Sequence, residues 1–432
     1  MFRRLTLMAT PDQATLNHAA QILASISTDH RADLALRFYF ERHRYLRPAA
    51  KRHISHAVFV YFRWLSWLDP KASPQKRIEQ AAKLHERFTA DPASIKVEAL
   101  AARAVPHWLA SEVELPADTL RQLQRDPALW IRVRRGHAAE VTKTLVHCSP
   151  AVLPAWLTGL EPQLSAFTFT GTQDLFRTEP FDAGEFEIQD LASQIVGHAC
   201  APQPRETWWD ACAGEGGKML HLADLMANKG LIWATDRNAR RLETLKHRAA
   251  RAQVFNYRTA LWDGSARLPT KTKFDGILVD APCSGVGTWQ RNPQARWTAT
   301  LDDVNQLATT QLTLLNLVAG SLKPRGRLIY SVCTLTRSET TAVADAFSAA
   351  HPELEPLPLF NAAGVADPGP RAPSPATTSS VPGSTLNPQL STSASSLSAS
   401  SSQLSSLNSQ LFLWPHELNA NGMFIAAWQA RA

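Results

Sequence analysis

Two cysteines each stand just after a predicted strand, a position where reacting groups are often found. Cys283 follows the apolar run 276–279, the acid Asp280 and two further residues, and Cys333 directly follows the run 327–332. In an open parallel sheet, ligands and reacting groups gather at the carboxyl ends of the strands. Free cysteine is only a few per cent thiolate at pH 7, so a nucleophilic cysteine needs activation by its surroundings. The pair therefore predicts a thiol nucleophile with a helper.

A glycine-rich turn predicts a cofactor site. Residues 210–218 read Asp-Ala-Cys-Ala-Gly-Glu-Gly-Gly-Lys and stand between a short aromatic strand and a helix. Glycines allow the backbone to approach a ligand, and the helix amides then point at it. The spacing is neither that of a P-loop nor a clean G-x-G-x-x-G, so a tight turn without a ligand is the alternative. The candidate cofactor residues here are Cys212, Ala213, Gly214, Glu215, Gly216, Gly217 and Lys218.

Two acids strengthen the cofactor interpretation. Asp236 stands 20 residues after Gly216, at the end of the predicted strand 232–235, where a carboxylate can accept hydrogen bonds from ribose hydroxyls. NAD would satisfy the same geometry, so the pair indicates an adenosine-containing cofactor and no more. Asp263 follows a third predicted strand and is expected near the adenine, with a loop-capping aspartate as the alternative interpretation.

The elements that position these residues alternate between strand and helix. The sequence predicts strands at 208–209, 231–235, 277–279 and 327–332, and helices that begin at 217, 238 and 301, the last running to 322. Such alternation implies right-handed crossovers and a parallel sheet. Residues 422–428 are a further apolar run and predict a final strand. We therefore expect an α/β domain over 201–432.

The preceding part of the chain has a different pattern. From 12 to 117, apolar residues recur every three or four positions, which predicts a helical domain over 1–120. Residues 121–200 mix a strand at 129–133, a helix at 138–145 and a turn into a helix within 184–196, which fits a small linking or RNA-positioning module. The helical region is rich in basic and aromatic residues: Arg37, Phe38, Tyr39, Arg42, Arg44, Tyr45, Arg47, Lys51, Arg52 and Arg63. An RNA-facing patch or an ordinary solvated helix face would explain them.

A serine-rich stretch interrupts the α/β domain. Residues 371–410 hold 15 serines and one charged residue, Arg371. Such a segment cannot bury enough apolar surface to offset its ordering entropy. We expect a disordered insertion over 366–410.

Composition limits the class of protein. The chain has 432 residues, 44% of them hydrophobic, and a net charge of +7, which fits a partner with a phosphate backbone. Its five cysteines lack C-x-x-C spacing, which argues against a disulfide scaffold, a zinc site or an oxidising compartment. The N-terminus lacks the apolar core of a signal peptide, and the longest apolar run, 57–68, is interrupted by Arg63. We expect a soluble cytoplasmic monomer without a metal or membrane partner.

Taken together, these motifs resemble the Fmu/Sun family of RNA cytosine carbon-5 methyltransferases. The resemblance rests on Asp-Ala-Pro-Cys-Ser-Gly at 280–285, Arg-Asn-Pro at 291–293 before Trp297, Ser-Val-Cys-Thr at 331–334 and the glycine-rich turn. It covers roughly 184–338 and the final strand. Upstream, the helical region with Arg52, Tyr61 and Arg63 is similar to the NusB-type RNA-binding domain of bacterial members.

The resemblance implies a Rossmann-like class I methyltransferase that uses S-adenosylmethionine. Cys333 would add to carbon 6 of cytosine, and Asp280 would hydrogen-bond or protonate ring nitrogen 3. Cys283 would assist removal of the carbon-5 proton and release of Cys333. The turn 212–218 with Asp236, Asp263 and Asp280 would hold the cofactor. The target base must be unstacked, which favours single-stranded or looped RNA, with 16S ribosomal RNA as the expected substrate.

The chain departs from the family pattern at two places. Gly214-Glu215 replaces the usual Ala-Pro, and Glu339-Thr340-Thr341 replaces Glu-Asn-Glu. Neither change touches the two thiols or Asp280. Three alternatives remain: a noncatalytic RNA-binding ribosome-assembly factor, a methyltransferase acting on tRNA or 23S rRNA, and an NAD-dependent oxidoreductase, which gives no reason for paired thiols.

Overall fold

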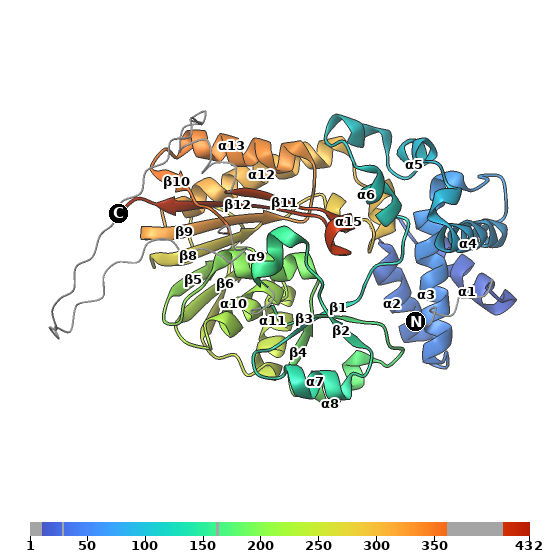
Figure 1. Cartoon of the computed structure of the whole chain (residues 1–432), viewed down its shortest axis with the longest axis horizontal. Coiled ribbons are helices and arrows are strands. Elements are labelled where there is room, and N and C mark those ends of the chain that lie inside the picture. The colour runs from blue at the N-terminus through green and yellow to red at the C-terminus, as the bar shows by residue number, and fades with distance from the viewer. Residues whose placement is uncertain (1–10, 28–29, 161–163, 361–408) are drawn as a thin grey trace, which may run out of the picture.

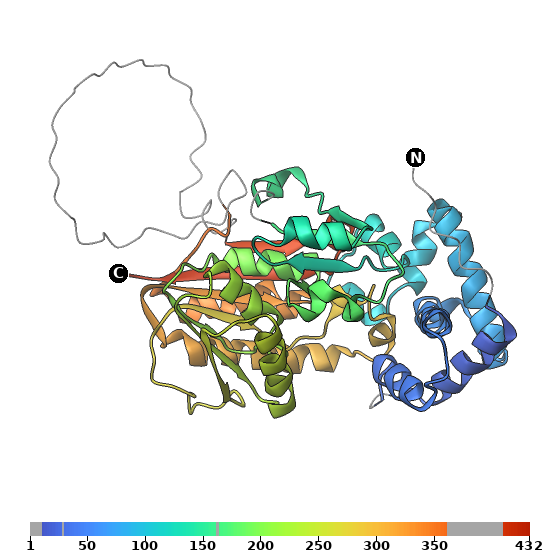
Figure 2. The same ribbon diagram turned by 90° about the horizontal axis from the view of Figure 1, so that it is seen from below.

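A computed structural model describes residues 11–27, 30–160, 164–360 and 409–432. A helical part lies at one end of the molecule and a large sheet at the other, as Figures 1 and 2 show. Most of the predicted insertion 366–410 falls outside the described residues. Its last two residues are exceptions, because Ser409 is buried and Gln410 opens strand β11, so the expected disorder is wrong there.

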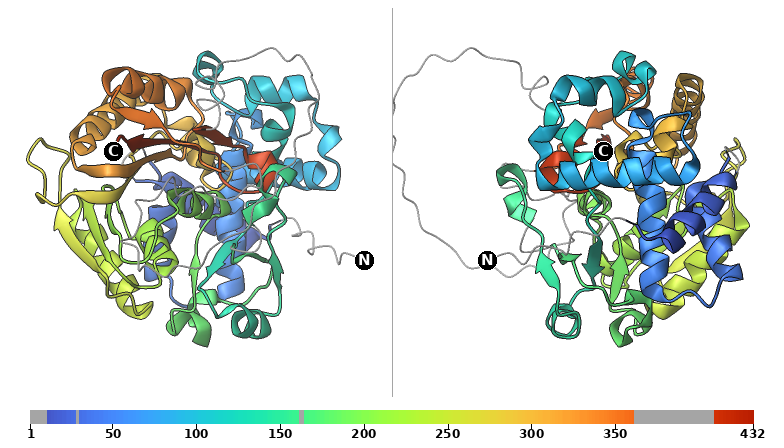
Figure 3. Two further views of the ribbon diagram at one scale, coloured as in Figure 1. Left: turned by 60° about the vertical axis from the view of Figure 1, so that its left-hand side comes forward. Right: turned by 90° about the vertical axis from the view of Figure 1, so that its right-hand side faces the viewer.

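The helical part confirms the helical periodicity predicted from 12 onward. Its helices are α1 (Gln13–Ala24), α2 (Ala32–Arg42), α3 (Pro48–Arg63), α4 (Pro74–Ala90), α5 (Val97–Arg103) and α6 (Ala117–Gln122). The Asp12 side chain caps α1 by accepting a 2.8 Å hydrogen bond from the Thr15 amide, and Pro48 starts α3, where a missing N–H costs nothing. Ile54, Val58 and other buried apolar residues of this part form one core. The right panel of Figure 3 shows the helices of this part facing the viewer.

A small antiparallel sheet follows, with strand order β2-β3-β1-β4. Its elements are β1 (Trp130–Val133), α7 (Ala138–Thr144), β2 (Cys148–Pro150), β3 (Ala166–Phe169), α8 (Glu179–Asp182) and β4 (Phe186–Ile188). The sequence predicted β1 and α7 but missed β4, because three residues are too short to show an alternating pattern. Gly184, which precedes β4, has a φ of +70° and a close approach to the Arg251 carbonyl, so only glycine fits there.

The large sheet has the order β10-β12-β9-β8-β5-β6-β7, and β11 pairs with β12. Its strands are β5 (Thr207–Asp210), β6 (Leu231–Asp236), β7 (Tyr257–Leu261), β8 (Phe274–Asp280), β9 (Leu322–Val332), β10 (Leu354–Pro356), β11 (Gln410–Leu413) and β12 (Met423–Ala430). The pairs among β5 to β9 are parallel, and those made by β12 are antiparallel. The predicted mostly parallel α/β fold is confirmed.

Helices cover both faces of this sheet. They are α9 (Leu191–Cys200), α10 (Gly217–Leu225) and α11 (Ala239–Arg251) on one face, and α12 (Leu301–Ala319) and α13 (Thr341–Ala350) on the other. The consecutive residues Trp208 and Trp209 pack into opposite cores, as the period of two in a strand requires. Two apolar cores, one on each face of the sheet, therefore fix the strands whose ends carry the candidate site.

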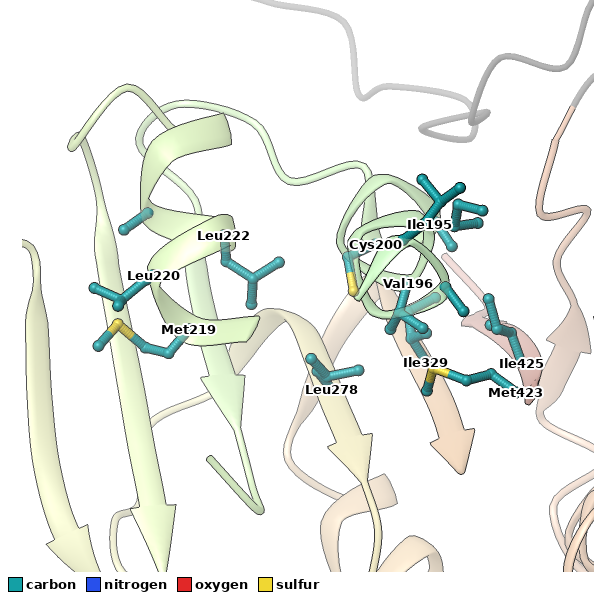
Figure 4. Packing of buried hydrophobic residues seen from close by; sticks show 14 of the residues in the cluster. Ile195, Val196, Cys200, Met219, Leu220, Leu222, Leu278, Ile329, Met423 and Ile425 are labelled. Carbon is teal, nitrogen blue, oxygen red and sulfur yellow. The ribbon is translucent and has the colours of Figure 1, made fainter. Parts of the chain in front are cut away.

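Figure 4 shows part of the first core, where α9 and α10 pack onto the sheet. The labelled side chains are Ile195, Val196, Cys200, Met219, Leu220, Leu222, Leu278, Ile329, Met423 and Ile425. Cys200 has no exposed surface, and its burial raises the pKa of its thiol. It therefore acts as a small apolar core residue.

One predicted boundary is wrong. The helix expected over 301–322 ends at Ala319, and strand β9 already begins at Leu322, so the sequence 323–326 lies inside the strand rather than before it. A register shift between Phe274 and Gly276 on β8 accommodates the turn-like residues, and Arg325 adopts a φ of +61°. A bulge of this kind leaves no periodic signal in the sequence.

The helical part is fastened to residues 289–299 by hydrogen bonds from buried side chains. Arg296 is completely buried and donates to the carbonyls of Ala104, Leu123 and Trp289. Trp297 Nε1 donates to the Phe62 carbonyl at 2.7 Å. The motif 291–297 therefore joins the end of β8 to the helical part.

Arg63 belongs to this interface and not to an RNA-facing surface. Its side chain is 1% exposed, pairs with Asp126 at 2.9 Å and donates to the Gln290 carbonyl at 3.2 Å. The expectation that Arg63 joins an exposed basic patch is therefore wrong, because α3 turns this position toward the junction. No helix in the described ranges is both long and apolar enough to span a bilayer.

Candidate active site

The two predicted cysteines meet at the carboxyl ends of β8 and β9. These strands are parallel neighbours, with Asp280 opposite Ser331, and the Sγ atoms of Cys283 and Cys333 lie 3.2 Å apart. Both cysteines are free and half-buried. At this separation one sulfur can donate a hydrogen bond to the other, which would stabilise a thiolate on the accepting sulfur.

The surroundings favour the charge on Cys333. The hydrogen bond from Cys283, together with the nearby Lys218 and Arg291, lowers the pKa of Cys333 despite its burial and the proximity of Asp280. The same hydrogen bond, burial and the negative charge of Glu339 raise the pKa of Cys283. Cys333 is thus the better nucleophile of the pair, and Cys283 keeps the proton.

Asp280 lies beside the thiols and is held from two directions. Lys218 Nζ donates to Asp280 Oδ2 at 2.8 Å, and Ser331 Oγ donates to Asp280 Oδ1 at 2.8 Å. Although burial opposes its charge, the carboxylate of Asp280 raises the pKa of Lys218. The glycine-rich turn therefore reaches the thiol site through its last residue, Lys218.

A cavity of about 560 Å³ opens at this edge of the sheet, which is a size typical of small-molecule sites. Its lining includes Cys212, Ala213, Gly214, Glu215, Gly217, Lys218, Asp236, Asp263, Asp280, Cys283 and Cys333. Every predicted site residue except Gly216 is among them. Gly216, with a φ of +86°, instead lies where a Cβ would be 2.6 Å from Leu245 Cγ, so it is needed for helix packing.

Asp236 is positioned by backbone amides. Gly214 N donates to Asp236 Oδ2 at 3.0 Å, and Asn238 N donates to Oδ1 at 2.8 Å. Gly214 has a φ of +55°, a conformation in which glycine avoids strain. Asp263 accepts a hydrogen bond from the Ser265 amide at 3.0 Å and also lines the cavity. It therefore caps its loop and faces the cavity at the same time.

Several cavity residues were missed from the sequence. They are Ser193, Asp210, Arg237, Arg241, Trp262, Thr309, Thr310, Thr313 and Leu314. Asp210 could have been found, because it is a strand-end acid directly before the glycine-rich turn. The residues of α12 could not, because only the packing of that helix over β8 brings them to the cavity.

Asp210 is a completely buried acid at this edge. Over the described residues, no donor reaches either carboxyl oxygen in good hydrogen-bonding geometry, although the nearby Cys212 amide favours the charged form. Burial, reinforced by the charge of Asp280, raises the pKa of Asp210 to about 8. Burial therefore favours the neutral form of Asp210, which lines the cavity.

The Cys283 loop, residues 282–288, is hydrogen-bonded to Cys333 and to Gly422, the residue before β12. Gly287 N donates to the Cys333 carbonyl at 3.1 Å, and Gly422 N donates to the Gly287 carbonyl at 2.8 Å. A Cβ on Gly287 would lie 2.0 Å from the Gly422 oxygen. The loop therefore requires glycine at this position to keep the two cysteines together.

A second polar cluster lies away from the cavity, at the junction with the helical part. His56 Nε2 and His85 Nε2 lie 3.2 and 3.1 Å from Asp126 Oδ2, and these ligand-type atoms are within 4.8 Å of one another. Arg63 binds the other Asp126 oxygen, and Trp64 Nε1 donates to His85 Nδ1 at 3.4 Å, which leaves the His85 proton on Nε2, facing Asp126. We interpret the cluster as a hydrogen-bonded junction.

The chemistry of the cavity wall indicates the kind of ligand it fits. Five lining residues are acids and three are bases; the Lys218–Asp280 pair removes one of each, and burial favours the neutral form of Asp210. Carboxylates suit hydroxyl and ammonium donors and repel phosphate groups. Trp262 and Leu314 supply apolar surface for a ring. The wall therefore fits a nucleoside that carries a cationic group better than a dinucleotide.

Comparison with known proteins agrees with this chemistry. The sequence model of a family described as 16S rRNA methyltransferase RsmB/F matches residues 198–429, which is more than half of the chain.

Two curated relatives and one solved structure illustrate the similarity. A probable ribosomal RNA small subunit methyltransferase B of Bacillus subtilis (strain 168) is 40% identical over 181 residues, 41% of this chain and 40% of that protein. The tRNA (cytosine(72)-C(5))-methyltransferase NSUN6 of Mus musculus is 33% identical over 194 residues, again 41% of this chain and 40% of that protein. The chain thus matches about two fifths of the length of each.

The solved structure extends the comparison to the whole fold. The protein described as "Crystal Structure of PH0851" superposes with a TM-score of 0.69 and covers 96% of this chain and 97% of its own, at 21% identity. At this identity the likeness concerns the fold alone.

Proposed function

Because the chain belongs to the family described as 16S rRNA methyltransferase RsmB/F, we propose that it methylates carbon 5 of a cytosine in RNA, with 16S rRNA as the expected target. One observation carries the proposal: the two sulfur atoms lie 3.2 Å apart beside the Lys218–Asp280 ion pair. Carbon 5 of cytosine is a poor nucleophile, and thiolate addition to carbon 6 activates it. A methyltransferase acting on oxygen or nitrogen would have no use for paired thiols.

S-adenosylmethionine is the proposed cofactor, and it supplies the methyl group on a sulfonium centre. Asp236 would accept hydrogen bonds from the ribose, while Trp262 and Asp263 would contact the adenine. Asp210 would face the cationic part of the molecule, which would favour loss of its proton. The turn 212–218 would line the remaining wall with backbone.

In the proposed reaction, Cys333 Sγ forms a bond to carbon 6, and the electron pair of the 5,6 double bond moves into the ring toward nitrogen 3 and carbon 5. Asp280 would offset this charge by passing to nitrogen 3 a proton drawn from its partner Lys218, and it would take the proton back when Cys333 leaves. Carbon 5 then takes the methyl group, and the sulfonium sulfur leaves as a neutral thioether.

Cys283 would complete the reaction. Once Cys333 is bonded to carbon, its negative charge no longer raises the pKa of Cys283, so Cys283 ionises more readily. It could then take the carbon-5 proton, after which the electron pair of that C–H bond restores the double bond and expels Cys333 as thiolate. Each cysteine thus has one role, and the roles follow from the charges around them.

The helical part is the proposed RNA-binding region. Its exposed cations include Arg37, Arg42, Arg44, Arg47 and Arg52. Arg37 is paired with Glu41 at 3.2 Å, whereas Tyr45 among them is 72% exposed and could stack on a base. We keep the expected division into domains 1–120, 121–200 and 201–432, and the NusB-like nature of the first, as parts of this proposal.

The RNA target is the least constrained part of the proposal. The mouse relative is named for a tRNA cytosine, so tRNA is the alternative target. We would incubate the purified protein with labelled S-adenosylmethionine and with 16S rRNA, 23S rRNA and tRNA, each transcribed without modification. The expected product is 5-methylcytidine in 16S rRNA, identified by mass spectrometry of nucleosides. Methyl transfer to another atom, or binding of RNA without transfer to any of the three, would contradict the proposal.

A further inference from the structure

Glu339 is a buried acid close to the thiol pair, but it does not line the cavity. It ends the short helix η8 (Arg337–Glu339), and its side chain has no exposed surface. Four donors reach its carboxylate: Ser284 N at 2.8 Å, Gln311 Nε2 at 3.0 Å, Thr336 Oγ1 at 2.8 Å and Ser284 Oγ. All four donors are neutral, so the negative charge of Glu339 stays in the protein interior.

These contacts hold the backbone on both sides of Cys283. Glu339 binds the amide and hydroxyl of Ser284, which follows Cys283. Gln311 donates to the carbonyl of Pro282, which precedes it, at 2.9 Å, and to Glu339. Tyr330 Oη lies 2.9 Å from Gln311 Oε1 and 2.6 Å from the Glu339 carbonyl oxygen, and its one proton can bond to either. The Cys283 loop is therefore held by hydrogen bonds to the residues on both sides of Cys283.

The charge of Glu339 also makes the two thiols inequivalent. Negative charge from Glu339 acts on Cys283, whereas the negative charge of Asp280 acts on Cys333 together with the positive charges of Lys218 and Arg291. Two sulfurs 3.2 Å apart that share one proton respond to this difference, because the proton moves to the site where the potential is more negative. A neutral residue in place of Glu339 could hold the loop but could not create this bias.

Building on the function proposed above, we propose that Glu339 is a positioning residue that clamps the Cys283 loop and keeps the shared proton on Cys283, so that the thiolate forms on Cys333. Titratable groups that act on the pair are Asp280, Lys218 and Arg291 around Cys333, and Glu339 and Tyr330 around Cys283. Glu339 is the acid that acts on Cys283. Asp280, which is paired with Lys218, is the acid that acts on Cys333.

The test measures the two thiols without RNA or cofactor. Iodoacetamide reacts with thiolates, so brief labelling of the folded protein between pH 6 and 9, followed by peptide mass mapping, gives the ratio of labelled Cys333 to labelled Cys283. Wild type should label mainly at Cys333. E339Q, which removes the charge and nearly preserves the shape, should shift the ratio toward Cys283 on the order of tenfold, equivalent to one pKa unit.

Two further variants separate charge from structure. E187Q neutralises another buried carboxylate, one that pairs with Arg248 and Arg251 far from the thiols, and should leave the ratio unchanged. E339D keeps the charge with a shorter reach and should keep Cys333 as the first thiol labelled. A folded E339Q with the wild-type ratio would overturn the proposal.

Circular dichroism melting of each variant checks the fold. If E339Q does not fold, E339D decides: preferential labelling of Cys333 supports the charge bias, and equal labelling of the two cysteines overturns it. Because the ratio requires no methyl transfer, it can fail while the wild-type enzyme methylates RNA, and it can hold if no RNA is methylated. The failure of this inference is thus distinguishable from failure of the proposed function.

Discussion

The junction with the helical part and the cavity edge of the large sheet both bury charged side chains, but in different surroundings. Arg296 at the junction is completely buried, and three carbonyls accept its hydrogen bonds. Asp210 at the cavity is equally buried, yet no donor in the described residues binds its oxygens well. Satisfied polar groups fix an arrangement, whereas unsatisfied ones remain available to a ligand. This difference distinguishes Arg296, which fixes the junction, from Asp210, which lines the site.

Removal of Arg296 should have the largest effect. Arg296→Met would leave the carbonyls of Ala104, Leu123 and Trp289 buried without this donor, at roughly 1–3 kcal/mol for each unsatisfied group. We expect the free energy of unfolding to fall by about 3 kcal/mol or more, measured by urea denaturation. Arg47→Met, at an exposed position, is the control and should change stability by less than about 0.5 kcal/mol. Equal effects of the two substitutions would remove the distinction between scaffold and surface.

Gly287→Ala should break the site without unfolding the scaffold. The new Cβ would lie 2.0 Å from the Gly422 oxygen, so the Cys283 loop must move. We expect kcat for methyl transfer to fall at least about tenfold, which is about 1.4 kcal/mol in the barrier. Gly320→Ala is the matched control, because a Cβ added there would have no atom within 4 Å and its φ is negative. Full activity of Gly287→Ala would show that the loop position is not critical.

Asp210 makes the stability of the cavity edge depend on pH. Its folded-state pKa, about 8, is above the unfolded value of 3.8, so between these values the folded protein holds a proton that the unfolded chain has lost. The contribution of Asp210 to stability should therefore fall as pH rises from about 4 to 8, by at most about 1.4 kcal/mol per pH unit. Asp210→Asn should flatten this slope in urea denaturation of the cofactor-free protein between pH 5 and 8. An unchanged slope would mean that Asp210 is ionised in the folded state.

The exposed face of the helical part should give the smallest effect. Arg44→Gln combined with Arg52→Gln removes two exposed charges and no buried contact. If this face binds RNA, the slope of log affinity against log salt should become less negative by about 0.7 per charge, as for single strands. Fluorescence anisotropy at several salt concentrations measures it. The same slope as wild type would place the RNA elsewhere.

Much of the fold could be predicted because its strands and helices carry strong periodic patterns. The strand ends at 279 and 332 and the glycine-rich turn were visible, and parallel pairing is what brings Cys283 and Cys333 together. The three-residue strand β4 and the bulge near Gly276 left no comparable pattern. Short or irregular elements depend on tertiary contacts that leave no local pattern in the sequence.

Candidate site residues whose type has few possible roles, such as the two cysteines, could be predicted from the sequence. Residues whose role depends on tertiary packing could not. Gly216 looked like a cofactor residue, but contact with Leu245 explains it. Arg63 looked like an RNA contact, but it is buried against Asp126. Glu339 showed only as part of a family motif, because its clamp on Ser284 depends on how η8 folds back beneath the loop. Spacing alone cannot distinguish these outcomes.

The central claim is that Cys333 attacks the base and Cys283 releases it. The most direct measurement is denaturing electrophoresis of radiolabelled target RNA after reaction with S-adenosylmethionine and wild type, Cys283→Ala, Cys333→Ala or the double variant, with Cys148→Ala as a control. We expect a denaturant-resistant protein–RNA adduct for Cys283→Ala, and neither adduct nor methyl transfer for Cys333→Ala and the double variant. An adduct formed by Cys333→Ala, or methyl transfer by it at the wild-type rate, would contradict the account.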